Sequence, residues 1–296
     1  MRGGAIGDFV LTLPVLTALR AQFPQTHLEV LGYAHIAQLA LAGSLADAIR
    51  SIEARPLAGF FARKGELSPE LSQYFAGFNV IISYLYDPDE IFQTNVARCT
   101  KAQFITGPHR PNEQLSIHAT EVFLKPLERL AIFDADPTPR LSLQVQPAKR
   151  NLIAVHPGSG SERKNWPEAK WVELLQSLLV TTNVNLLLVG GEAEGDRLHR
   201  LAARLSAERI QLAQNLPLTE LAQLLHSCRA FVGHDSGISH LAAAVGLPGL
   251  VLWSDTVEAI WRPKSARVEI VRHSRSLDEL SVTQVVVEAQ KIFAAH

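Results

Sequence analysis

Four short segments combine residue types that can bind or transform a substrate, and the first lies at the start of the chain. A glycine-rich loop over residues 3–7 leads directly into Asp8 and an apolar run. Glycines allow a tight turn and a close approach of the backbone to a ligand. Asp8 falls at the beginning of a predicted helix, where its carboxylate either caps that helix or faces a substrate cleft. The residues alone leave both interpretations open.

The second segment is a glycine- and serine-rich loop between a predicted strand that ends at His156 and a predicted helix that begins at Pro167. Backbone N–H groups in such a loop can cradle phosphate oxygens, together with the hydroxyls of Ser159 and Ser161. Lys164 adds a positive charge on a flexible stem. The spacing is not that of a Walker A loop, and an ordinary flexible loop is an equally good interpretation.

The third segment, residues 231–248, joins another predicted strand to another predicted helix. Asp235 and Ser236 open that helix, and Gly237 follows them. A helix N-terminus presents unpaired N–H donors and the positive end of its dipole to an anion. His240 lies within the first turns and can point at the same anion. This pattern favours an anion-binding site over a purely structural turn.

The fourth segment, residues 190–197, places Glu194 between a predicted strand and a predicted helix. Its carboxylate either accepts hydrogen bonds from a ribose or is a favourable charge at a helix start. Two D-x-D patterns, at Asp87 and Asp134, fall at a helix start and in a linker, and neither position suits a metal site. The zinc motif H-E-x-x-H, clustered Cys and His, and the nucleophile motif G-x-S-x-G are absent. We therefore predict no metal site.

Strand-to-helix turns must position these segments, and the sequence supplies them throughout. Short β-branched runs alternate with longer amphipathic stretches, which predicts an α/β fold with parallel sheets covered on both faces. The predicted strands are residues 28–31, 80–85, 103–106, 152–156, 184–189, 230–233, 249–253 and 268–271. The predicted helices are residues 8–22, 34–42, 88–98, 114–133, 167–180, 193–206, 219–227, 237–245 and 282–294.

A proline-containing segment, residues 134–150, divides the chain into two halves that are each long enough for an α/β core. We predict an N-terminal domain over residues 1–140 and a C-terminal domain over residues 150–296, with the last helix able to pack back on the N-terminal domain. A cleft between the two domains is where ligands of such sheets bind. The glycine loop begins almost at Met1, although such loops normally follow a strand. Either the start of the sequence omits a strand, or the first sheet is incomplete.

Composition argues against several classes of protein. The 296 residues carry 28 Lys+Arg and 29 Asp+Glu, which gives a net charge of −1. Basic and acidic residues are about equally numerous in each half of the chain. This balance disfavours nucleic-acid binding. Cys99 and Cys228 can form neither a disulfide framework nor a zinc site, which fits a reducing cytoplasm. Asp8 and Arg20 bracket the N-terminal apolar run and argue against a signal peptide. The charge-free run 237–254 changes period partway and contains a proline, so we predict no transmembrane segment.

Together these segments resemble the family 9 glycosyltransferases, whose best-known members are the ADP-heptose:lipopolysaccharide heptosyltransferases. The resemblance covers nearly the whole chain. It rests on the ordered motifs Gly4-Ala-Ile-Gly-Asp-Phe-Val-Leu-Thr-Leu-Pro14, His156-Pro-Gly-Ser, Lys164-Asn-Trp-Pro167, Asp235-Ser-Gly-Ile-Ser-His-Leu-Ala-Ala-Ala244, Trp261-Arg-Pro263 and Leu280-Ser-Val-Thr-Gln-Val-Val. It implies the GT-B fold: two facing Rossmann-like domains with an interdomain cleft, the first binding the acceptor and the second the nucleotide sugar. The chain departs from the family in the missing first strand and in Ser236, where threonine is commoner.

The resemblance also implies a reaction. The chain would be an inverting, metal-independent glycosyltransferase that moves a sugar, heptose from ADP-heptose, onto a lipopolysaccharide core or related glycan. Asp8 matches the general base that takes the proton of the acceptor hydroxyl. The residues that match nucleotide-sugar contacts are Ser159, Ser161, Lys164, Glu194, Asp235, Ser236, Gly237 and His240. The donor is a substrate, and no cofactor is implied.

An anionic acceptor would need cations on the N-terminal domain. The candidates are Arg55, Arg63, Lys64, Arg98, Lys101, Arg110 and His118. The implied partners are the nucleotide-sugar donor and a glycolipid or glycan acceptor at the inner membrane surface, so we expect a cytoplasmic protein peripheral to that membrane. Two alternatives remain: a GT-B nucleotide-sugar epimerase, and a non-catalytic nucleotide-sugar-binding module. The epimerase would need acid and base groups around the sugar, and the module would need no Asp8.

Overall fold

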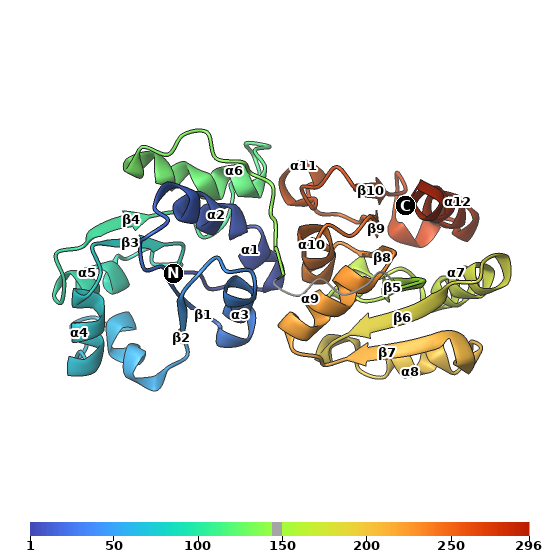
Figure 1. Ribbon diagram of the computed structural model, residues 1–296, viewed down its shortest axis with the longest axis horizontal. Coiled ribbons are helices and arrows are strands. Elements are labelled where there is room, and N and C mark those ends of the chain that lie inside the picture. The colour runs from blue at the N-terminus through green and yellow to red at the C-terminus, as the bar shows by residue number, and fades with distance from the viewer. Residues whose placement is uncertain (144–149, 296) are drawn as a thin grey trace. The chain divides into compact units, whose positions relative to one another are not determined.

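The computed structural model describes residues 1–143 and 150–295. The chain forms two compact units, Met1–Pro137 and Thr138–His296 (Figure 1). Strands and helices alternate in both units, which confirms the predicted α/β class. Residues 144–149 of the predicted linker lie outside the described residues. The boundary at residues 140–150 and the interdomain cleft stay predictions.

The second unit is built on a six-stranded parallel sheet. Its strands are β5 (Leu152–His156), β6 (Asn185–Gly190), β7 (Ile210–Gln214), β8 (Ala230–His234), β9 (Gly249–Leu252) and β10 (Val268–Val271). The spatial order is β10-β9-β8-β5-β6-β7, which is the Rossmann order with β5 as the first strand. Every residue of β5 and β8 is buried, as expected for central strands that are covered on both faces.

Helices follow the strands of this sheet. They are α7 (Glu168–Thr181), α8 (Arg197–Ala202), α9 (Leu218–Ser227), α10 (Gly237–Ala244), α11 (Glu258–Trp261) and α12 (Val282–Ala295). The C-terminal helix α12 packs on α7, β8 and β9. Its residues Val285, Ala289 and Phe293 belong to the core of the second unit. The apolar face of α12 thus completes the core beside β8 and β9, and the expected packing of this helix on the N-terminal domain stays a prediction.

The first unit contains two separate two-stranded parallel sheets. They pair β1 (Glu29–Gly32) with β2 (Ala48–Ser51) and β3 (Val80–Ser83) with β4 (Gln103–Thr106). The helices of this unit are α1 (Ile6–Val10), α2 (Leu13–Gln22), α3 (Ala34–Ala42), α4 (Pro69–Ala76), α5 (Ile91–Ala97) and α6 (Ala119–Leu124). Two residues at the chain start, Met1 and Arg2, are hydrogen-bonded to β3 and β1 respectively. The glycine loop then leads from Arg2 into α1.

Prolines break two of the predicted helices. The predicted helix over residues 8–22 is split into α1 and α2, because Pro14 lacks the N–H that would continue α1 and instead lies in the first turn of α2. The predicted helix over residues 114–133 shortens to α6, which passes at Lys125 and Pro126 into a 3-10 helix over Lys125–Leu130. Both corrections follow from the missing proline donor.

Four of the described helices and strands were missed by the sequence analysis, among them α11, which has four residues. Strands β2 and β7 are edge strands that are only partly buried, so they lack the continuous apolar run that marks β5 or β8. Helix α4 is short and follows a cap at Ser68, whose hydroxyl accepts a hydrogen bond from the Leu71 N–H at 3.5 Å. Among the described residues, each helix is too short or too polar to cross a membrane.

Candidate functional site

The carboxyl ends of β5 and β8 mark the point where the strand order of the second sheet reverses. His156 of β5 is paired in register with Gly233 of β8, so the segments that follow the two strands leave the sheet side by side. Ligands of open α/β sheets bind at such a switch point, outside the carboxyl ends of the strands. Three of the four segments selected from the sequence follow β5, β6 and β8, and two of them meet at this point.

A buried histidine holds the glycine- and serine-rich loop that follows β5. His234, the last residue of β8, accepts a hydrogen bond from the Trp166 N–H at its Nε2 over 2.8 Å. Its Nδ1 lies 3.3 Å from the carbonyl oxygen of Gly158 and donates to it. The ring therefore contacts both ends of the loop. Burial lowers the pKa of His234 to about 3, so the imidazole is neutral at physiological pH and keeps Nε2 as an acceptor.

The loop also carries its own internal contacts. The Ser159 hydroxyl lies 2.7 Å from Asn165 Oδ1 and 2.8 Å from the carbonyl oxygen of Ser161. Arg197 donates to the Pro157 carbonyl oxygen at 3.1 Å and forms an ion pair with Glu162 at 2.9 Å. Since these bonds fix the loop, the backbone groups of residues 158–162 are preorganised. The interpretation of this segment as a phosphate cradle stays a prediction.

Lys164 and Asp235 form the ionic centre of the site. Lys164 Nζ lies 2.7 Å from Asp235 Oδ2, and the Thr256 hydroxyl donates to the same oxygen. Asp235 is 7% exposed, whereas the Lys164 side chain keeps 27% of its surface exposed. The loop after β5 and the turn after β8 are thereby joined by one buried carboxylate. Because the Lys164 ammonium group is partly exposed, it can leave Asp235 and bind a diphosphate oxygen.

Helix α10 begins directly beside this ion pair. Ser236 is its N-cap, with its hydroxyl accepting a hydrogen bond from the Ser239 N–H at 3.4 Å. Gly237 is the first helical residue, and His240 is buried in the first turns. The Ser239 hydroxyl donates to the carbonyl oxygen of His234, which ties the helix to the end of β8. The predicted residues Lys164, Asp235, Ser236, Gly237 and His240 are thus brought together in the second unit.

Glu194 lies inside the same end of the sheet. Its Oε2 accepts a hydrogen bond from the Gly191 N–H at 2.6 Å, and its Oε1 lies 4.0 Å from His156 Nε2. Burial lowers the pKa of His156, whose Nδ1 donates to the Val189 carbonyl oxygen at 2.9 Å. Gly158 is required here, because a β-carbon at that position would overlap the Glu194 carboxylate. Glu194 holds its own turn in this structure, and its predicted contact with a ribose stays a prediction.

Several contact residues of this site escaped the sequence analysis. Asn165, Arg197 and Thr256 each hold a predicted residue or its loop. His234 had a usable signal, since it ends a strand and directly precedes Asp235. Thr256 had none, because it comes from a turn after β9 that is distant in the sequence.

In the first unit, Asp8 occupies the third position of α1. Its Oδ2 accepts a hydrogen bond from the Ala5 N–H at 3.0 Å, so the carboxylate does cap the helix start. Its Oδ1 lies 3.3 Å from the Arg2 guanidinium. The side chain is 28% exposed and thus accessible to solvent. The preceding loop needs Gly4, which adopts a φ of +96°.

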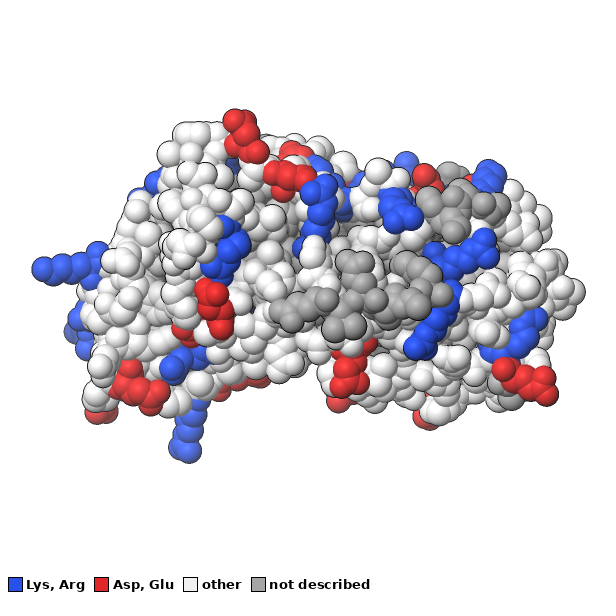
Figure 2. Space-filling view, in the orientation of Figure 1, with Lys and Arg blue, Asp and Glu red and all other residues white. Residues whose placement is uncertain are grey.

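The predicted acceptor cations are distributed over several elements of the first unit. Arg63 pairs with Asp89 at 3.0 Å, and Arg110 with Glu113 at 3.5 Å. Arg98 donates to the Gly65 carbonyl oxygen at 2.9 Å, which places it beside the loop that carries Lys64. Arg55 and Lys101 are exposed. On the face shown in Figure 2, Lys and Arg are interspersed with Asp and Glu.

His118 differs from those cations. It is buried and acts as the N-cap of α6, with Nδ1 accepting a hydrogen bond from the Thr120 N–H at 3.3 Å. A ring held in this way is poorly placed to bind an acceptor. Its selection from the sequence followed only from its residue type.

The first D-x-D pattern makes contacts within its own unit, and among the described residues no group of three or more His, Cys, Asp or Glu side chains could hold a metal ion. Asp87 caps α5 by accepting hydrogen bonds from the N–H groups of Phe92 and Gln93 at 3.1 and 2.9 Å. Asp89 pairs with Arg63. The first pattern is therefore a helix start, as the sequence analysis predicted.

Comparison with known proteins identifies the family. Residues 114–287 match the model of glycosyltransferase family 9 (heptosyltransferase). The chain is 35% identical over 130 residues to the lipopolysaccharide heptosyltransferase 1 of Pseudomonas aeruginosa, an alignment that covers 44% of this chain and 33% of that protein. The alignments with the next three curated relatives each cover 37% of their length. The chain thus spans about a third of the length of the curated relatives that it matches first.

Solved structures share the fold. A glycosyltransferase of family 9 from Veillonella parvula superposes with a TM-score of 0.81 at 16% identity, over 99% of this chain and 96% of that one. The E. coli ADP-heptose lps heptosyltransferase II superposes with a TM-score of 0.77 at 16% identity, over 100% and 99%. These likenesses confirm the predicted GT-B fold. The family model matches more than half of the residues of this chain, so the chain belongs to glycosyltransferase family 9.

Proposed function

We propose that this protein is an inverting, metal-independent glycosyltransferase that moves heptose from ADP-heptose onto a lipopolysaccharide core or related glycan. Its similarity to lipopolysaccharide and lipooligosaccharide heptosyltransferases supports both the sugar and the acceptor class. An acceptor of this kind lies at the inner membrane surface, so the protein would act there from the cytoplasm.

The observation that carries this proposal is the Lys164–Asp235 pair at the start of α10. A helix N-terminus supplies N–H donors and a positive dipole end for phosphate oxygens. Lys164 supplies a mobile charge only 2.7 Å from the carboxylate beside that helix. These are the elements needed to hold a diphosphate and to stabilise the charge it gains as it leaves. A divalent cation would be redundant in this arrangement.

The reaction would then proceed by a single displacement. The Asp8 carboxylate takes the proton of the acceptor hydroxyl as its oxygen bonds to the anomeric carbon of the donor. The bond between that carbon and the diphosphate oxygen breaks, and ADP departs with the electron pair. Attack from the face opposite the leaving group inverts the anomeric centre. General base catalysis of this kind contributes roughly 10²–10⁴-fold to the rate.

Incubation with ADP-heptose tests the proposal, once with and once without a lipopolysaccharide acceptor. Transfer requires the acceptor and yields a glycoside of inverted configuration. An isomerised sugar formed without acceptor would instead identify an epimerase. Binding with no turnover in either mixture would identify a nucleotide-sugar-binding module.

A further inference from the structure

Two exposed aromatic rings meet at the carboxyl ends of β3 and β4 in the first unit. Tyr86 is the third residue after β3, and His109 is the third residue after β4, its parallel partner. The centroids of the two rings lie 4.7 Å apart with their planes at 61°. Tyr86 is 70% exposed, and His109 is exposed as well. This aromatic pair lies outside the carboxyl ends of the strands, where open α/β sheets bind their ligands.

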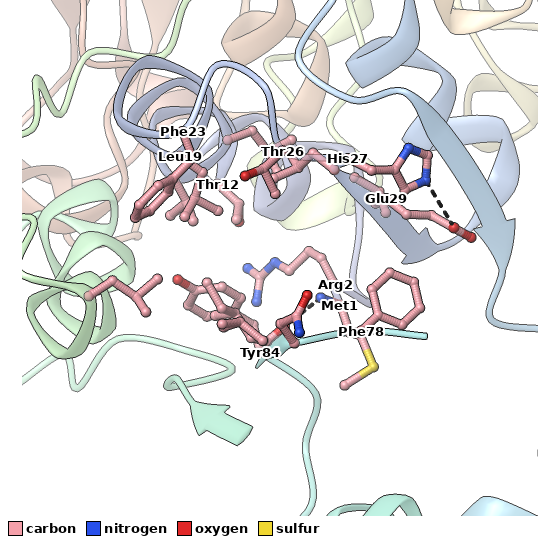
Figure 3. Close-up of a pocket in the computed structure, with 18 of the residues that line it drawn as sticks. Met1, Arg2, Thr12, Leu19, Phe23, Thr26, His27, Glu29, Phe78 and Tyr84 are labelled. Carbon is pink, nitrogen blue, oxygen red and sulfur yellow. Dashed lines mark hydrogen bonds and ion pairs between the residues drawn. The ribbon is translucent and has the colours of Figure 1, made fainter. Parts of the chain in front are cut away.

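The buried side chain of Tyr84 fixes the two segments that carry the aromatic pair. Gly107 packs directly on the Tyr84 ring, because a β-carbon at that position would overlap it. Figure 3 shows Arg2 beside Tyr84, and the Arg2 guanidinium lies 5.9 Å from the centroid of that ring. Tyr84 and Gly107 each stand two residues before a member of the pair, Tyr86 and His109 respectively. The arrangement of the two exposed rings therefore follows from buried packing beneath them.

Arg2 connects the aromatic pair to Asp8. Its Nη1 donates to the His109 carbonyl oxygen at 2.9 Å, and its Nη2 donates to Asp8 Oδ1 at 3.3 Å. A guanidinium group is planar and rigid, so it sets the spacing between these two oxygens. A second contact acts in the same direction, because Leu85 packs against the glycine loop at Gly3. The aromatic pair is thus held close to the Asp8 carboxylate.

The chemistry of the pair suits one face of a sugar ring. A pyranose presents apolar C–H groups on its faces and hydroxyl groups around its rim. The face of an aromatic ring carries partial negative charge and attracts such C–H groups. A neutral imidazole adds one hydrogen-bond donor and one acceptor for a rim hydroxyl. A sugar held in this way keeps its remaining hydroxyls available for reaction.

An exposed aromatic residue without these contacts occurs in the same unit. Phe133 follows the 3-10 helix over residues 125–130 and is 69% exposed. Single apolar side chains on a surface are common and require no ligand. Tyr86 differs from Phe133 because it has a ring partner, lies at a strand end and is tied through Arg2 to Asp8.

We propose that Tyr86 and His109 form the subsite for the acceptor sugar whose hydroxyl Asp8 deprotonates. Tyr86 supplies the stacking face, and His109 holds that ring at its angle and bonds a hydroxyl of the sugar. This inference rests on the proposed glycosyl transfer. It assigns recognition of the acceptor ring to an aromatic pair, in addition to the cations selected from the sequence.

A binding experiment without donor tests the subsite separately from the reaction. A deacylated lipopolysaccharide core oligosaccharide is titrated into the full chain, with heat as the readout. Because the probe carries no acyl chains, the titration reports sugar contacts and excludes lipid contacts. The variants are Tyr86→Ala, Tyr86→Phe and His109→Ala, and the matched control is Phe133→Ala.

We expect Tyr86→Ala to raise the Kd for the oligosaccharide roughly 3- to 10-fold, the scale of one aromatic contact. Tyr86→Phe keeps the stacking face and should bind nearly as well as the unaltered chain. His109→Ala should weaken binding by a smaller factor than Tyr86→Ala, because the Tyr86 face remains. Phe133→Ala should leave the Kd unchanged.

Steady-state transfer from ADP-heptose supplies a readout that a purely structural role would not give. Tyr86→Ala should raise the KM for the acceptor by the same factor as the Kd. It should leave kcat and the KM for ADP-heptose nearly unchanged, because the pair neither takes the proton nor belongs to the donor unit. A fall in kcat or in Tm with an unchanged acceptor KM would overturn the proposal.

The titration gives the other contradicting results. An unaltered chain that does not bind the oligosaccharide would overturn the subsite, and so would equal affinities in Tyr86→Ala and Phe133→Ala. A chain that binds the oligosaccharide through Tyr86 but transfers no heptose would support the subsite and contradict the proposed reaction.

Discussion

The two units of this molecule differ in how their strands are joined: the second has one six-stranded sheet and the first has two two-stranded sheets. In the second unit β5 connects the two halves of a continuous sheet, and the loop after it is held by His234, Arg197 and Asn165. In the first unit Met1 and Arg2 are hydrogen-bonded to β3 and β1, and the loop after them carries Asp8. The comparison teaches that the proposed donor site is held in place by its own sheet. The proposed catalytic Asp8 depends on a short pair of ladder bonds and on Arg2.

Arg2 holds Asp8 in place, as His234, Arg197 and Asn165 hold the loop after β5. Its guanidinium is buried, lies 4.4 Å from the Phe123 ring, and donates to the His109 carbonyl oxygen at 2.9 Å. It also donates to the Asp8 main-chain carbonyl at 3.2 Å and pairs with its carboxylate. The Asp8 carboxylate is therefore held by one cation and by the Ala5 N–H, whereas Lys164 pairs with a carboxylate that Thr256 also holds.

The largest expected effect comes from Asp8→Asn. The side-chain oxygen of Asn can still accept from the Ala5 N–H, as Asp8 does, but Asn cannot take the proton of the acceptor hydroxyl. We expect turnover to fall by ~10²-fold or more, with ADP affinity nearly unchanged because the donor residues belong to the other unit. Steady-state transfer and calorimetry on one preparation measure both quantities. Near-normal transfer by a folded Asn variant would leave Asp8 as a cap alone.

Replacing Lys164 sharpens the comparison from the donor side. Lys164→Ala removes a charged hydrogen bond worth about 1.5–3 kcal/mol, so the Kd for ADP should rise roughly 10- to 150-fold. The matched control is Lys291→Ala, because Lys291 is an exposed lysine of α12 that pairs with nearby Glu288 at 2.7 Å. Equal ADP affinity in the two variants would remove Lys164 from the donor site.

The buried histidines predict how the second unit responds to acid. The pKa of His234 is about 3 in the folded protein, below the ordinary value of 6.5, so the unfolded chain binds a proton that the folded chain excludes. The contribution of His234 to the free energy of unfolding is therefore fully present above pH 6.5 and is lost as the pH falls towards 3. His156, whose pKa is also lowered, acts in the same direction.

His234→Gln tests this assignment. A glutamine can still accept from the Trp166 N–H through its side-chain oxygen, but it does not titrate. The acid-induced loss of stability should become shallower in the variant when denaturant unfolding is measured from pH 7 to pH 4. An unchanged pH profile would show that His234 does not control the response.

Two glycines of the loop after β5 should give smaller and different effects. At Gly160 the φ is +70° and a β-carbon would meet open space, so Gly160→Ala should cost about 1 kcal/mol of backbone strain and leave ADP affinity nearly intact. At Gly158 a β-carbon would overlap Glu194, so Gly158→Ala should weaken ADP binding as well. Unfolding and titration of both variants separate strain from damage to the site. A Gly158 variant that binds ADP normally would contradict the described packing.

Much of the second unit could be predicted from the sequence because its central strands are continuous apolar runs. In the second unit, β5 and β10 were predicted with their observed bounds. In the first unit, the same holds for β4 and α3. The three turns that carry Lys164, Glu194 and Asp235 were located because glycines and serines interrupt apolar segments at strand ends. Their convergence follows from the parallel order of the sheet.

The remainder depended on contacts that no local pattern encodes. β2 and β7 are partly exposed edges without an apolar run. The contacts that Thr256 and Arg197 make join residues 21 and 40 positions apart in the chain. His118 was selected for its residue type, whereas its burial and its cap of α6 appear only in three dimensions.

One titration tests the central claim most directly, namely that the end of β5, Lys164 and the start of α10 hold the donor diphosphate without a metal. ADP is titrated into the full chain in excess EDTA and again in excess Mg²⁺, with heat as the readout. The account predicts binding of one ADP with the same Kd in both solutions. Loss of binding in EDTA that Mg²⁺ restores would contradict it.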